Sequence, residues 1–266
     1  EGWALPQEQV SLDVEAKLGK GAYGGVLLGK YLHTSVAVKL SLSEDASDRI
    51  LDVANDIRYL RTLAHPNIVT FYGACFVQDS FDCLVVMEDL SAGQDLKSLI
   101  SQGLLGSKEV QDNVLVGIIS ALVYLHPRLI HGDLKPQNVM VVGSQVKLID
   151  FGLSRYCRPK ARSAGGTLAY MAPEVISQTS KPLPPADIFS FGRLAFQVST
   201  GKKPVEVSKE ELREMASRGL APALPWPDDD TPQTVVEMCN RCTCSGPSGR
   251  PSASDLLMML SRETPQ

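Results

Sequence analysis

This sequence of 266 residues has no stretch that is apolar enough to span a membrane. Its most apolar run, residues 114–125, is broken by Gly117 and Ser120 and is shorter than the ~20 residues that a spanning helix needs. We therefore expect a buried helix there and no membrane span. A signal peptide is also absent and the chain does not begin with methionine, so we expect an excised domain of a cytoplasmic protein.

The chain is also poor in basic charge and in metal-binding patterns. It has 26 Lys and Arg against 30 Asp and Glu, a net charge of −4 and a pI near 5.6, which argues against nucleic acid as its main partner. Its six cysteines include one C-x-x-C pair, Cys239 and Cys242, and no second pair that would complete four zinc ligands. We expect free thiols, which suit the cytosol.

The remaining composition is that of an ordinary globular protein. Hydrophobic residues make up 44% and charged residues 21%, and no internal repeat is visible. A chain of this length is long enough to build two packed lobes.

Polar residues that suit phosphoryl transfer gather in the middle of the chain. Asp133 can accept a proton from an attacking hydroxyl, and Lys135 can offset charge on a γ-phosphate. Asn138 and Asp150 offer the hard oxygen ligands that Mg²⁺ prefers, and Asp150 begins an Asp-Phe-Gly sequence. The combination predicts a phosphotransferase if a nucleotide site lies upstream.

A glycine-rich segment that suits such a nucleotide site is present. Gly19, Gly21, Gly24 and Val26 form a G-x-G-x-x-G-x-V pattern, whose backbone amides can lie close over phosphate oxygens. A Rossmann turn shares these glycines but opens a helix, with an acidic residue about twenty positions on. Here apolar, β-branched runs follow, so we predict strands around residues 26–31 and 35–40 and a hairpin over the nucleotide.

Lys39 ends the second of these strands and needs anionic partners if it is buried. The α- and β-phosphates of a nucleotide are natural candidates. The apolar spacing of residues 43–63 predicts a helix, and two acids of that helix, Asp52 and Asp56, could reach Lys39. We favour Asp56 as the ion-pair partner.

Taken together, these motifs resemble the eukaryotic protein-kinase family. The resemblance covers nearly the whole chain in order, and it extends to a buried aspartate, Asp187, and a late arginine, Arg250. Phe189 stands where a tryptophan is common in the family. The matching segments are residues 19–26, 36–39, 65–69, 131–138, 150–152, 172–174 and 187–192.

The resemblance implies an α+β bilobal kinase fold. A small antiparallel β-sheet lobe with one main helix would span residues 1–87. The hinge would be residues 88–93, and a larger, mainly helical lobe would span residues 94–266.

The resemblance also implies ATP and Mg²⁺ as cofactors and proteins as substrates. Asp133 would be the catalytic base, Lys135 the γ-phosphate contact, and Asn138 and Asp150 the metal ligands. Lys39 and Asp56 complete the catalytic set. The implied nucleotide-binding residues are Gly19, Gly21, Gly24, Val26, Ala37, Lys39, Met87, Glu88, Leu90 and Met140.

Within that set, Val26 and Ala37 would cover the adenine from above and Met140 from below. Met87 aligns with the gatekeeper position, so the Glu88 carbonyl and the Leu90 amide would meet the adenine edge. Two further contacts are implied. Glu174 would pair with Arg250, and a side-chain stack of Leu60, Phe71, His131 and Phe151 would join the lobes.

Two residues depart from the family pattern. The partner of the strand lysine is usually glutamate, nine positions before the histidine found here as His65, and that position is Asp56. Aspartate is shorter by about 1.5 Å, so we expect the helix to lie closer or a water to intervene, and Asp56→Glu to leave kcat unchanged or higher. Gly132 replaces an arginine that normally receives the loop phosphate, which predicts a kinase of the non-RD type, less dependent than usual on loop phosphorylation.

The stretch from Asp133 to Asn138 resembles the Ser/Thr version of the catalytic loop, and Thr167 would line the substrate pocket. Other features resemble the tyrosine kinase-like group, which includes Raf, mixed-lineage and many plant kinases. We therefore expect Ser/Thr specificity, with dual specificity open. Ser154, Tyr156 and Ser163 are candidate autophosphorylation sites.

Two rival functions remain at this point. A pseudokinase that acts as an ATP-binding scaffold or allosteric partner is favoured by Asp56 and Gly132, and opposed by the presence of Lys39, Asp133 and the metal ligands. A small-molecule phosphotransferase generally lacks the Ala172-Pro173-Glu174 segment that shapes a peptide site. Protein kinase activity is the preferred interpretation.

Overall fold

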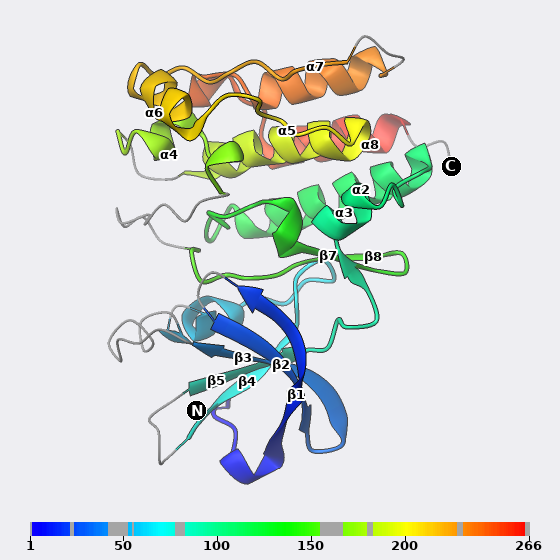
Figure 1. The fold of residues 1–266 in the computed structure, drawn as a ribbon, viewed down its shortest axis with the longest axis vertical. Coiled ribbons are helices and arrows are strands. Elements are labelled where there is room, and N and C mark those ends of the chain that lie inside the picture. The colour runs from blue at the N-terminus through cyan, green and yellow to red at the C-terminus, as the bar shows by residue number, and fades with distance from the viewer. Residues whose placement is uncertain are drawn as a thin grey trace.

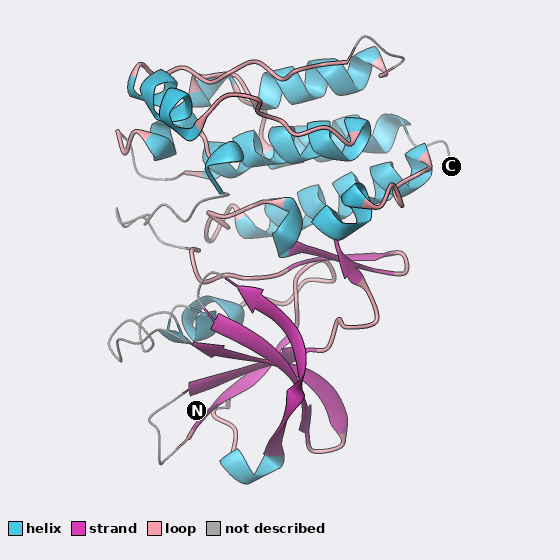
Figure 2. Cartoon of the chain, viewed as in Figure 1, coloured by secondary structure: helices cyan, strands magenta, loops and turns pink. Residues whose placement is uncertain are grey.

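The chain folds into a β-sheet lobe and a helical lobe (Figures 1 and 2). This computed structural model describes residues 2–21, 24–41, 53–54, 56–77, 83–154, 167–179, 183–227 and 231–263. The N-terminal strands gather at one end of the molecule and most of the helices stack at the other. The α+β bilobal fold is thus confirmed.

The small lobe is built on a five-stranded antiparallel sheet with the order β1-β2-β3-β5-β4. Alternation along β3 gives the sheet two faces. Val36 and Val38 enter an apolar cluster on the outer face, whereas Lys39 pairs with Val85 and faces the large lobe. The strands are β1 (Val10–Gly21), preceded by the 3₁₀ turn η1 (Gln7–Gln9), β2 (Gly24–Tyr31), β3 (Thr34–Ser41), β4 (Phe71–Phe76) and β5 (Cys83–Glu88).

The helix that carries Asp56 is described at residues 53–54 and 56–60, so the N-terminal part of the predicted helix lies outside the described residues. It ends earlier than predicted. Thr62 and Leu63 donate to carbonyls only three residues back, which tightens the chain into a turn. The helix ends early because His65, the residue before Pro66, disfavours helical backbone.

The large lobe begins with a three-stranded sheet, β6-β7-β8, beneath a set of helices. The predicted buried helix at residues 114–125 is part of α3, which starts after its N-cap Ser107. No helix of the described ranges is long and apolar enough to cross a membrane. The elements are β6 (Gln94–Asp95), α2 (Leu96–Ser101), α3 (Lys108–Leu125), η2 (Pro136–Asn138), β7 (Val139–Val142), β8 (Gln145–Leu148), η3 (Thr167–Ala169), α4 (Pro173–Ile176), α5 (Pro184–Thr200), α6 (Lys209–Ser217), α7 (Gln233–Cys242), η4 (Pro247–Gly249) and α8 (Ala253–Glu263).

Helix α5 is the most deeply buried helix element of the large lobe. Pro184 and Pro185 lie in its first turn, where a missing N–H costs nothing. Twelve of its residues are buried. It therefore serves as the central support for the elements around it.

One apolar cluster continues through both lobes and includes Leu60, Val85, Leu122, Phe151 and Phe196. Backbone hydrogen bonds reinforce it between the segment before β4 and strand β8. Val69 N donates to Leu148 O at 3.0 Å, and Leu148 N donates to Asn67 O at 2.9 Å. This segment precedes the expected lobe boundary in sequence, yet it is bonded to the large lobe.

We expect Gly192→Ala to destabilise the domain, because a Cβ there would lie 2.5 Å from Cys242 Cβ and 2.9 Å from Thr243 Cγ2, where α5 packs against α7. The added methyl should cost about 1–3 kcal/mol in the free energy of unfolding, measured by chemical denaturation. Gly246→Ala is the matched control, since its φ is −79° and a Cβ there would have no atom within 4 Å. Equal stability of the two variants would contradict this interpretation of the α5–α7 contact.

Candidate active site

The glycine-rich segment forms the predicted hairpin. Gly19 pairs with Val26 and Gly21 with Gly24 across β1 and β2, while residues 22 and 23 at the tip lie outside the described ranges. A strand follows the glycines where a Rossmann turn would have a helix, so the predicted hairpin is confirmed. Val26 lies opposite Lys39 in the β2–β3 register, which places it on the same face of the sheet as Ala37.

Lys39 lies between two carboxylates. Its Nζ is 2.8 Å from Asp56 Oδ2 and 2.8 Å from Asp150 Oδ1. Burial alone would lower the pKa of Lys39, but the two carboxylates raise it well above its usual range, so the ammonium stays charged. The predicted ion pair with Asp56 is therefore present, with no water between its members. The aspartate side chain is shorter than glutamate, yet it reaches Lys39 directly. The other acid considered, Asp52, lies outside the described residues.

Asp150 is held in an uncommon backbone conformation, with φ at +63°. For a residue with a Cβ this left-handed conformation costs about 1–2 kcal/mol. Its Oδ1 accepts from Lys39 and, at 3.4 Å, from Gly152 N, which keeps the carboxylate fixed. No group in the described parts of the chain donates to its Oδ2, which leaves that oxygen available to a cation.

The Asp133 carboxylate accepts hydrogen bonds from two neighbouring side chains. Its Oδ2 accepts from Lys135 Nζ at 2.5 Å and from Asn138 Nδ2 at 3.1 Å, and Asn138 Nδ2 also donates to its carbonyl at 2.9 Å. Its Oδ1 is buried and has no hydrogen-bond partner among the described residues. Burial raises the pKa of Asp133 and Lys135 partly offsets this, which makes the carboxylate a better proton acceptor.

The buried Asp187 of α5 orients the catalytic loop through its backbone. It accepts from His131 N at 2.7 Å and from Gly132 N at 2.9 Å, and His126 Nε2 lies 3.3 Å from its Oδ2. Burial would raise the pKa of Asp187, but these partners hold it below its usual range, so it stays an anion. The role of His126 was not foreseen, because nothing in its sequence neighbourhood marks it.

Gly132 has a conformational reason to be glycine. Its φ is +80°, and a Cβ there would lie 2.9 Å from Leu153 O. The same two loops are joined by Ser154, whose Oγ donates to His131 O at 2.9 Å. Ser154, a candidate autophosphorylation site, is fully buried, so its hydroxyl is not accessible to another molecule in this structure. The other two candidates, Tyr156 and Ser163, lie outside the described residues.

Glu88, the first of the expected hinge residues, ends β5. Its carboxylate pairs with Lys147 of β8 at 2.7 Å and accepts from Thr70 N at 3.0 Å, so two partners fix the side chain. Met87 lies opposite Ala37 in the sheet. In the large lobe, Met140 lies opposite Lys147 in the β7–β8 hairpin. Sequence reasoning missed Lys147, which carries no motif.

The donor set fits Mg²⁺ bound together with a nucleotide. The described residues contain no group of three or more His, Cys, Asp or Glu side chains that could hold a metal alone. Mg²⁺ is usually bound by one or two protein oxygens plus substrate phosphates, which suits the Asp150 carboxylate and the Asn138 amide oxygen. Burial raises the pKa of both thiols of the Cys239–Cys242 pair, that of Cys242 to about 12.

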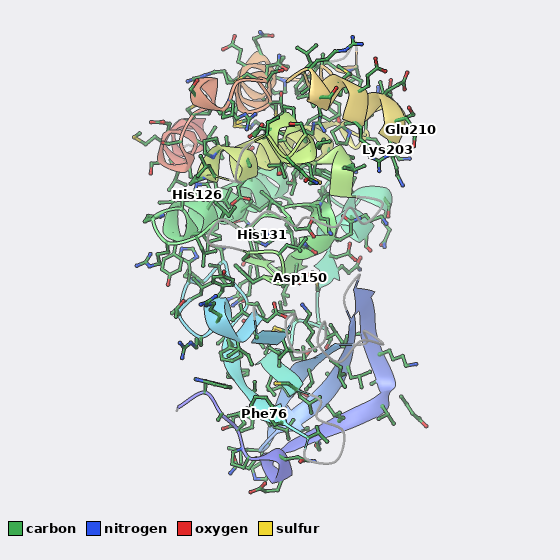
Figure 3. All side chains as sticks on the ribbon, turned by 90° about the vertical axis from the view of Figure 1, so that its left-hand side faces the viewer. Phe76, His126, His131, Asp150, Lys203 and Glu210 are labelled. Atoms are coloured by element: carbon green, nitrogen blue, oxygen red, sulfur yellow. The ribbon has the colours of Figure 1, made fainter. Side chains whose placement is uncertain are left out.

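One contact of the apolar stack that was expected to join the lobes is present. The rings of His131 and Phe151 lie 5.0 Å apart between centroids. Leu60 belongs to the same apolar cluster as Phe151, and Phe71 packs against that cluster. Figure 3 shows His131 and Asp150 where the lobes meet, whereas Phe76 lies far off on the sheet.

On the large-lobe side, Arg250 forms a two-point ion pair with Glu174. Its NH1 is 2.6 Å from Oε1 and its NH2 is 2.9 Å from Oε2, so the predicted pair is confirmed. The pair fixes the Ala172-Pro173-Glu174 segment, which lies at the start of α4. The side chain of Thr167, expected in the substrate pocket, lies outside the described atoms.

Residues 12–260 match the family described as the protein kinase domain. The chain belongs to the protein kinase family. This kinase domain is 36% identical to mitogen-activated protein kinase kinase kinase 13-A of Xenopus laevis over 98% of its length, and 34% identical to human mitogen-activated protein kinase kinase kinase 13 over 97%. It is 27% identical over 97% of its length to a RasGEF domain-containing serine/threonine-protein kinase X of Dictyostelium discoideum.

These relatives confirm the resemblance to serine/threonine kinases of the tyrosine kinase-like group. The kinase domain spans about a quarter of the length of each, namely 26%, 26% and 27%. The likeness therefore concerns only that part of each relative.

The direct contact changes what we expect of Asp56→Glu. The Lys39–Asp56 pair already closes at 2.8 Å and Asp56 is 2% exposed, so a side chain about 1.5 Å longer must displace Lys39 or the helix. We now expect kcat to fall about tenfold to a hundredfold in steady-state assays. Asp112→Glu is the control, because it lengthens an exposed Lys–Asp pair on α3. An unchanged kcat would show that the helix moves freely enough to absorb the extra methylene.

Proposed function

We propose that this kinase domain transfers the γ-phosphoryl group of Mg-ATP to Ser and Thr hydroxyls of protein substrates. The observation that carries the proposal is the state of Asp133. One of its carboxylate oxygens accepts hydrogen bonds from Lys135 and Asn138. The other oxygen is buried and has no hydrogen-bond partner among the described residues. An acceptor hydroxyl is the group that would complete this arrangement.

The chain's own residues supply orientation and charge in this proposal. Asp133 Oδ1 would accept the hydrogen bond of the attacking hydroxyl and take its proton late, while Lys135 offsets charge on the transferred group. When bound, Mg²⁺ would neutralise phosphate charge, held by Asn138 and Asp150. Because Lys39 is already placed by two carboxylates, it would reach the α- and β-phosphates with little rearrangement.

The nucleotide would lie between the lobes. The backbone of Gly19, Gly21 and Gly24 would cover its phosphates, and the adenine would fit between Ala37 and Val26 above and Met140 below. The Glu88 carbonyl and the Leu90 amide would meet the adenine edge. The Glu88–Lys147 pair supports this, since it fixes the side chain of Glu88 and leaves the main chain to face the ligand.

Ser and Thr are the preferred acceptors for two reasons. Lys135 stands two positions after Asp133, where it holds the base, and the relatives at 27–36% identity are named serine/threonine-protein kinases or mitogen-activated protein kinase kinase kinases. Dual specificity remains compatible with these observations. The five cysteines of the described ranges are free, which supports the expected cytoplasmic location.

Gly132 supports regulation of the non-RD type. It offers no cation to a phosphorylated loop, and the catalytic loop is instead tied to the segment after Asp150 by the Ser154 hydroxyl. A second candidate function, a pseudokinase that binds ATP as a scaffold, is favoured by the shortened partner Asp56. The direct Lys39–Asp56 contact weakens that argument, because the pair is made despite the shorter side chain.

Replacing Asp133 by Asn should abolish transfer, since the amide cannot accept the proton. We expect phosphate transfer from labelled Mg-ATP to casein to fall about a hundredfold or more, with ATP affinity within a few-fold. Nucleotide binding by both proteins with no transfer by either would favour the pseudokinase.

Dephosphorylated kinase domain should retain most of its activity. Treatment with a phosphatase, checked by mass spectrometry, is expected to change the initial rate of casein phosphorylation by less than about threefold, because Gly132 cannot receive a loop phosphate. A complete loss of activity that is restored by one phosphorylated loop residue would refute the non-RD assignment.

A further inference from the structure

The most unusual charged residue outside the nucleotide site is Arg193, in the middle of α5. It is 1% exposed and lies among apolar residues such as Phe191, Leu194 and Phe196. No carboxylate of the described ranges forms an ion pair with it, although buried charges are normally paired. Burial lowers the pKa of Arg193 to about 10, which still leaves the guanidinium charged at neutral pH.

Two interactions compensate the buried guanidinium. Its NH1 donates to Ala169 O at 2.8 Å, and its Cζ lies 4.5 Å from the centroid of the Phe189 ring. Arg250 stacks on the same ring at 4.9 Å. A desolvated cation–π contact and a charge-assisted hydrogen bond are both among the stronger non-covalent interactions, so a single carbonyl and a ring hold Arg193 in place.

Arg193 does not act alone on this segment. Ser190 Oγ donates to Tyr170 O at 2.8 Å, and the Tyr170 hydroxyl donates to Gln197 Oε1. Ser190, Arg193 and Gln197 are spaced i, i+3 and i+7, which places them on one face of α5. This face therefore fixes two consecutive residues, Ala169 and Tyr170, just before the Ala172-Pro173-Glu174 segment.

We propose that Arg193 is a positioning residue for the protein substrate: it fixes the Ala169 carbonyl and thereby the path of residues 168–171 that a substrate peptide meets. The inference rests on the proposed kinase function. The hydrogen bond and the ring contact of Arg193 both lie within the large lobe and involve neither Lys39 nor Asp150. Loss of its guanidinium should therefore impair the use of a protein acceptor more than the handling of Mg-ATP.

The test compares two reactions of the same purified protein. Arg193→Met keeps an unbranched apolar side chain of similar length and removes the donors. We expect kcat/KM for casein to fall about tenfold or more, as for the loss of one charge-assisted hydrogen bond, while Mg-ATP hydrolysis without acceptor stays within about twofold. Arg128→Met is the matched control, because Arg128 also donates to a carbonyl, at 2.9 Å, and stacks on a ring, at 4.6 Å, but on Tyr124 of α3.

Equal losses of casein phosphorylation and ATP hydrolysis would overturn the inference, and so would the absence of any change. If Arg193→Met does not fold, as judged by its melting curve, Ser190→Ala takes its place, since it removes the neighbouring bond to Tyr170 O and should show the same selective loss. Failure of the unaltered domain to phosphorylate casein would instead count against the proposed function itself.

Discussion

The ion pairs of Lys39 with two carboxylates are the interactions on which the proposed nucleotide site depends. One ammonium group joins three elements that are far apart in sequence: strand β3, the helix that carries Asp56, and the segment that begins at Asp150. Without the two carboxylates, burial would favour the neutral amine. Without the lysine, two acids would face each other in a poorly hydrated place, and Asp150 would lose the contact that sustains its left-handed backbone.

A second anion, Asp187, organises the other half of the site. It is buried in α5 and accepts from two successive backbone amides, so the direction of the catalytic loop is set by a helix rather than by the loop itself. The same helix reaches the segment at Ala169 and Tyr170 through different side chains. The proposed base Asp133 and the proposed peptide site are therefore supported by one helix, which explains why the interior of α5 tolerates polar residues.

The sequence was most informative where chemistry demands a fixed order of residue types. The glycines of the hairpin, Lys39, Asp133 and Asp150 could be assigned roles because few other arrangements serve a phosphorylated nucleotide. Polar side chains that pair only in the folded chain follow no such order in the sequence. Glu88 and Lys147 are 59 positions apart, His126 and Asp187 are 61 apart, and nothing local to either member indicates the other.

Other misjudgements have equally physical causes. The helix before Pro66 stops early because the backbone ahead of a proline avoids the helical region, while the apolar spacing continues to Leu63. Arg193 does have a signal in the sequence, because it is the one charged residue within an apolar run. Such a residue indicates a buried cation.

The backbone bonds between residues 67–69 and β8 have a mechanical consequence for the two lobes. The described backbone links the lobes at the chain crossing after Glu88 and again at the Val69–Leu148 contact. Because side-chain contacts yield more readily than these two backbone links, we expect the lobes to move by rotation about the line through both links. Separation of the lobes would then be a rotation about a fixed axis, so the parts of the small lobe farthest from that line would move most.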